Sequence, residues 1–78
     1  MNRKPETEPT AYAMLYRPPT QFGTLPRGVH VAGWKRVPPE LAQRFPNLPV
    51  SSRRFGEFYT NRPLTEMELR DYQIEIVS

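Results

Sequence analysis

The sequence predicts a small α+β domain, in which a three- to four-stranded, mostly antiparallel sheet carries two short helices packed on one face. The first observation is the length of 78 residues, which suits one domain. The second is the ten prolines, which divide the chain into short segments because proline interrupts helices and central strands. The third is that these segments follow one another in the order β-β-α-β-α-β. We therefore expect a single domain over residues 10–78.

The first predicted strand, residues 10–17, has two apolar faces, which favours an interior position in the sheet. Side chains alternate along a strand. One face therefore carries Tyr12, Met14 and Tyr16, and the other carries Ala11, Ala13 and Leu15. A loop over residues 18–28 follows, rich in proline and glycine. We expect Phe22 and Leu25 to anchor that loop on the core.

The second strand is predicted over residues 29–37 and the first helix over residues 38–45. Gly33 interrupts the alternation of the strand and indicates a β-bulge. Two prolines open the helical segment, and proline is favoured in the first turn of a helix. Leu41 and Phe45 are four residues apart, so they share one face of that helix.

The remaining elements are a strand over residues 53–60, a helix over residues 65–72 and a strand over residues 73–77. Thr65 and Glu68 have the spacing of a capping box, in which each side chain accepts a hydrogen bond from the other residue's backbone N–H. If strand 73–77 lies at an edge of the sheet, its unpaired backbone groups offer a route to a homodimer.

The composition indicates a cytoplasmic protein without membrane contact. Residues 1–9 are polar and contain two prolines, which predicts a disordered N-terminal tail without the apolar stretch of a secretory signal. No part of the chain has the ~20 apolar residues that a membrane span needs. The chain contains no cysteine, which suits a reducing compartment.

Residues that support catalysis or metal binding are sparse. His30 is the only histidine, and it alternates with valines in a predicted strand, so we interpret it as an outward-facing polar residue. An enzyme built around His30 would need a nucleophile beside it, such as Ser51 or Ser52. The carboxylates lack the spacing of metal ligands, and the four glycines fit no phosphate-binding loop. The sequence therefore predicts no enzyme, no metal site and no cofactor.

Two basic segments are the candidate binding sites, because each places positive charge beside an aromatic ring. Residues 17–62 carry eight Lys and Arg against two Glu, so the charge is concentrated in the middle of the chain. Arginine binds carboxylate and phosphate groups with a two-pronged fork. The candidate residues are Trp34, Lys35 and Arg36 in the second strand, and Arg53 and Arg54 at the start of the third.

We expect a small non-enzymatic accessory or regulatory protein that binds another protein through this arginine-rich surface and its proline-stiffened loops. The alternative is a nucleic-acid-binding protein, in which the same five residues contact phosphates and stack on bases, as in proteins that bind single strands. A third interpretation places Trp34 and Phe55 in the core and leaves the bases solvated.

Overall fold

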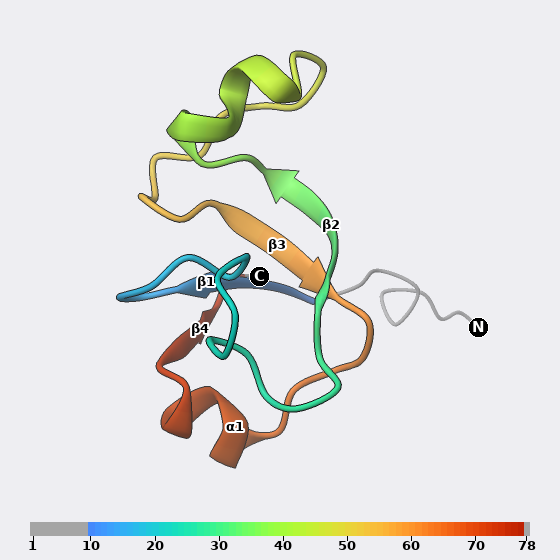
Figure 1. The fold of residues 1–78 in the computed structure, drawn as a ribbon, viewed down its shortest axis with the longest axis vertical. Helices are drawn as coiled ribbons and strands as arrows, with labels where there is room; N and C mark the ends of the chain where they lie inside the picture. The colour runs from blue at the N-terminus through green and yellow to red at the C-terminus, as the bar shows by residue number, and fades with distance from the viewer. Residues whose placement is uncertain (1–9, 78) are drawn as a thin grey trace, which may run out of the picture.

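The computed structural model describes residues 10–77, which form one four-stranded antiparallel sheet with two short helices (Figure 1). The strands lie side by side in the order β2-β3-β1-β4. Along the chain the elements are β1 (Ala11–Met14), β2 (Val31–Arg36), the 3-10 helix η2 (Pro39–Arg44), β3 (Glu57–Thr60), α1 (Glu66–Asp71) and β4 (Ile74–Ile76). The predicted α+β class, with a four-stranded sheet and two short helices, and the predicted element order are confirmed. The two helices do not share one face of the sheet, because α1 packs against β4 while η2 has no buried residue. The predicted tail, residues 1–9, lies outside the described residues.

β1 is an interior strand, as its two apolar faces predict. It pairs antiparallel with β3 on one side and with β4 on the other, and all four of its residues are buried. The strand ends at Met14, earlier than predicted, because the chain bends over residues 15–17 as it enters the loop before β2. Tyr16 is consequently 67% exposed and does not continue the inner face.

The core lies on one face of the sheet and is centred on Phe58 of β3, which is fully buried. The rings of Tyr12 and Trp34 each lie 6.3 Å from the Phe58 ring, measured between centroids. The segment that leads into α1 is also tied to this core, because the backbone N–H of Leu64 donates to the Tyr12 hydroxyl at 3.0 Å. Leu64, Leu69 and Tyr72 pack against the same cluster.

β2 contains two irregularities rather than the single bulge predicted near Gly33. The pairing of β2 with β3 shifts register between Val31 and Gly33, and again between Trp34 and Arg36. Each shift leaves one extra residue on β2, so the strand bends and twists more strongly. The bulges set the orientation of the side chains: Trp34 pairs opposite core residue Phe58.

The two helices lie at opposite ends of the molecule (Figure 1). α1 packs against β4, and its N-terminus has the predicted capping box: the Glu68 N–H donates to Thr65 Oγ1 at 3.1 Å, and the Thr65 N–H donates to Glu68 Oε1 at 3.0 Å. η2 follows β2, has a proline in its first turn and contains no buried residue. η2 therefore lies beyond the end of β2 (Figure 1) and contributes little to the core.

Candidate functional site

The predicted arginines converge on one buried carboxylate, that of Glu57. Its side chain is 8% exposed, and it accepts a hydrogen bond from the Ser51 hydroxyl at 2.8 Å. Arg36 Nε lies 3.4 Å from Oε1, and Arg53 Nε lies 4.0 Å from Oε2. A buried carboxylate needs such partners, since burying an unpaired charge is strongly unfavourable. β2, which carries Arg36, and the loop before β3, which carries Arg53, thus bring the two basic segments together.

Arg53 also crosses the sheet to a second carboxylate. Its Nη1 donates to Glu75 Oε1 on β4 at 2.8 Å. Ala13 of β1 is the partner of Glu75 in the register, and it is 1% exposed. The Arg53 guanidinium therefore links β3 and β4 over the small side chain of the strand between them. This charge network lies on the face of the sheet opposite the core, because Glu57 precedes Phe58 in the strand.

The five predicted binding residues do not all share that surface. Trp34 packs against Phe58 on the core side, with the two rings inclined at 71°. The Arg54 guanidinium lies 5.3 Å from the centre of the Phe55 ring. Arg36 and Arg53 keep 47% and 40% of their side chains exposed while they pair with acids.

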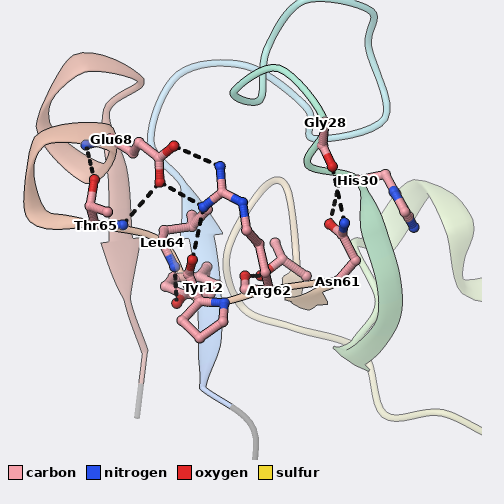
Figure 2. A network of polar contacts seen from close by, with 10 residues as sticks. Tyr12, Gly28, His30, Asn61, Arg62, Leu64, Thr65 and Glu68 are labelled. Atoms are coloured by element: carbon pink, nitrogen blue, oxygen red, sulfur yellow. Dashed lines mark hydrogen bonds and ion pairs between the residues drawn. The ribbon is translucent and has the colours of Figure 1, made fainter.

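His30 is exposed, and its backbone rather than its imidazole makes the described contacts. Its N–H donates to Asn61 Oδ1 at 2.8 Å, and Asn61 Nδ2 donates to the Gly28 carbonyl at 3.0 Å. Figure 2 shows the imidazole pointing away from these groups. Ser51 is bound to Glu57 instead of standing beside the histidine. Over residues 10–77 there is no group of three or more His, Cys, Asp or Glu side chains placed to hold a metal ion.

Arg62 and Glu68 form a two-pronged ion pair at the start of α1 (Figure 2). The two N–O distances are 2.9 and 2.7 Å. The hydrogen bonds from Arg62, and next the one from the Thr65 backbone, lower the pKa of Glu68 to about 2. The same pairing raises the pKa of Arg62. This contact joins the end of β3 to the capping box, so its role is to orient the helix.

A concave surface lies along the loop that links β1 to β2, drawn in teal in Figure 1. It is a groove of about 640 Å³ lined by residues 19–23, residues 25–31 and Tyr72. Leu25, Val29 and Tyr72 make part of the apolar wall. Arg27 and His30 are the ionisable bases in the lining, and no Asp or Glu of residues 10–77 contributes to it.

Phe22 on this groove is fully exposed, which contradicts the prediction that it anchors the loop in the core. Leu25 does pack against the core, as predicted. Gly23 follows Phe22 with a φ of 83°, a left-handed conformation that glycine adopts without strain, and the resulting turn directs the phenylalanine into solvent. Because the sequence pattern of a loop does not report the direction of its turns, sequence reasoning missed this groove.

Hydrogen bonds hold the groove loop in one shape. Thr24 is buried, and its hydroxyl lies 2.9 Å from the Pro18 carbonyl and 2.8 Å from the Gln21 carbonyl. The Val29 N–H donates to the Pro26 carbonyl at 2.9 Å. Asn61 fixes the far end of the loop at Gly28 and His30, as Figure 2 shows. The loop is therefore fixed at its beginning, middle and end.

No protein-family model matches the chain, and no curated protein sequence or solved structure is significantly similar to it. Among the described residues, no helix has the length and apolar character that crossing a bilayer requires.

Proposed function

We propose that this chain is a small non-enzymatic accessory or regulatory protein, and that it binds another protein in the groove formed by residues 19–31 and Tyr72. The observation that carries the proposal is Phe22, a large aromatic side chain that is fully exposed beside an apolar groove. Aromatic residues, Phe among them, are enriched at protein interfaces relative to the rest of the protein surface.

The charge of the groove indicates the chemistry of its partner. Arg27 contributes a positive charge, His30 contributes a second base, and none of the described Asp or Glu residues lines the surface. Complementary charge favours association and suppresses unsuitable partners. The groove therefore fits a peptide segment of another protein in which an aliphatic or aromatic side chain is flanked by a carboxylate.

The rigidity of the loop supports the same proposal. Thr24 and Asn61 hold the loop through side-chain hydrogen bonds to four backbone groups, and Pro26 restricts its backbone further. A surface that is already ordered loses less conformational entropy when its partner binds. The proline-stiffened loop is thus better suited to binding than a mobile loop of the same composition.

The arginine surface supports a second candidate, the binding of single-stranded nucleic acid through Trp34, Lys35, Arg36, Arg53 and Arg54. The observation in its favour is that Arg36 and Arg53 remain nearly half exposed. We rank it second because Glu57 and Glu75 already neutralise much of that charge, and because Trp34 packs against Phe58 instead of standing free for stacking.

Selection of a displayed random-peptide library on the folded chain tests the first candidate. We expect enriched peptides that combine apolar side chains with Asp or Glu. Phe22→Ala should weaken their binding at least about tenfold, which corresponds to 1.4 kcal/mol. Because Phe22 buries no surface, that variant should keep the stability of the parent chain.

Tyr16→Ala is the matched control for this measurement, since Tyr16 is another exposed aromatic residue that does not line the groove. It should leave the affinity unchanged. Peptides that bind Phe22→Ala as tightly as the parent chain, or a library that yields no binder, would refute the proposal.

A further inference from the structure

The outer edge of β4 carries backbone groups that no strand of the described chain pairs with. β4 is the last strand of the order β2-β3-β1-β4. The Leu15 N–H donates to the Gln73 carbonyl, and the Val77 N–H donates to the Ala11 carbonyl, so residues 73, 75 and 77 direct their backbone groups toward β1. By the alternation of an antiparallel ladder, Ile74 and Ile76 direct their N–H and C=O groups outward.

The opposite edge of the sheet, β2, is protected in a way that β4 is not. β2 has two bulges, at Ala32 and at Lys35, and Pro38 and Pro39 follow shortly after it, beyond Val37. Bulges, lysines and prolines are features that prevent one sheet edge from pairing with another. The register of β4 with β1 runs without a shift over all three of its residues. Within residues 10–77, β4 is therefore the strand that offers a regular edge for another strand to join.

The side chains of β4 fit a second copy of the same strand. Ile76 lies on the same face as the core residue Ile74, yet it is 52% exposed. In an antiparallel pairing centred on Glu75, Ile76 of each copy faces Ile74 of the other, which covers the exposed isoleucine. The two Glu75 side chains then lie opposite each other, where like charges are destabilising. Each is already paired with its own Arg53 at 2.8 Å, which offsets that repulsion.

We propose that two copies of this chain pair through β4 about a two-fold axis and form a continuous eight-stranded sheet in the order β2-β3-β1-β4-β4-β1-β3-β2. Such an interface is isologous, since each copy contributes the same strand. A three-residue strand makes a small contact. Small contacts are typical of weak complexes, so the dimer depends on protein concentration.

Sedimentation equilibrium of the full chain at rising concentration tests this proposal. We expect a shift from monomer to dimer below about 1 mM. Ile76→Pro should weaken dimerisation at least about tenfold, because proline removes an N–H that points outward but no hydrogen bond to β1. Ile76→Val, which keeps that N–H and most of the apolar surface, should still dimerise.

Amide hydrogen exchange supplies a second measurement that does not depend on a variant. The N–H groups of Ile74 and Ile76 should exchange more slowly as the concentration rises, and the N–H groups of β2 should not change. A chain that stays monomeric up to about 1 mM, a dimer that persists in Ile76→Pro, or protection that appears along β2 instead would each overturn the proposal.

Discussion

Glu57 is the residue on which the charged face of the sheet is organised. Its carboxylate accepts a hydrogen bond from the Ser51 hydroxyl and forms ion pairs with Arg36 and Arg53. Ser51 Oγ in turn accepts a hydrogen bond from the Arg53 backbone N–H at 2.9 Å. Removal of one partner of a buried, hydrogen-bonded charge is more damaging than removal of an exposed pair. The two arginines predicted as binding residues therefore also hold β2, β3 and the preceding loop together.

Glu68 makes the unfolding free energy of the chain depend on pH in the acidic range. Its pKa is lowered to about 2 from 4.5, first by Arg62. A carboxyl whose pKa is lower in the folded state stabilises the fold above its unfolded pKa. That contribution is lost as the pH falls from about 4.5 to about 2. We expect Glu68→Gln to flatten the pH dependence of the unfolding free energy in this window, measured by urea titration.

Glu66→Gln is the control for that prediction, because Glu66 lies in the same helical turn but is not the residue that Arg62 binds. It should retain the acid dependence of the parent chain. An equal slope in the Glu68→Gln protein would show that the ion pair with Arg62 does not stabilise the fold in solution.

At the scale of elements, Gly56 controls how the start of β3 meets the end of β2. It has a φ of 77°, and a Cβ on it would lie 2.7 Å from Pro38 Cδ and 2.9 Å from the Arg36 carbonyl oxygen. Gly56→Ala should therefore lower the unfolding free energy by about 2–5 kcal/mol, from backbone strain and overpacking together. Chemical denaturation measures this loss.

Gly23→Ala is the matched comparison, since Gly23 has a φ of 83° but open space around the position of a Cβ. The unfolding free energy of this variant should fall by about 1–2 kcal/mol, from backbone strain alone. Similar losses in the two variants would mean that the close approach of Pro38 to Gly56 does not matter.

Elements whose signals are local could be predicted from the sequence. The capping box needs only Thr65 and Glu68 three residues apart, and the buried strand β1 needs only apolar residues at consecutive positions. β3 was predicted to begin at Arg53, but it begins at Glu57 because the Gly56 N–H bonds to the Arg53 carbonyl in a turn. The bulges of β2 likewise depend on its pairing with β3, and a local sequence pattern does not predict that pairing.

The candidate sites were less predictable for the same reason. Arg36 and Arg53 were recognised as a basic surface, but their pairing with Glu57 and Glu75 requires the strand order and the register. Phe22 was expected to point inward because large aromatic residues in a small chain are usually needed for burial. Its exposure follows from the path of the whole loop, which Thr24 and Asn61 set through contacts with other segments.

At the scale of the whole molecule, the charge network, the groove and the free strand edge lie on distinct surfaces. The core face of the sheet is closed by α1 and by residues such as Leu25, and the opposite face carries the arginine and glutamate network. The groove lies along the loop between β1 and β2, and the free edge lies at β4. The proposed partner in the groove and the proposed second copy at β4 would consequently use different parts of the molecule.

The most direct test of the proposed function is an amide-shift titration of the ¹⁵N-labelled chain, first with the best selected peptide and then with a mixed-sequence single-stranded oligonucleotide. We predict that the peptide shifts the amides of residues 19–31 and Tyr72, and that the oligonucleotide leaves them unchanged at physiological salt. Shifts confined to residues 34–36 and 53–54, with the groove unperturbed, would contradict the groove proposal and favour the arginine surface as the binding site.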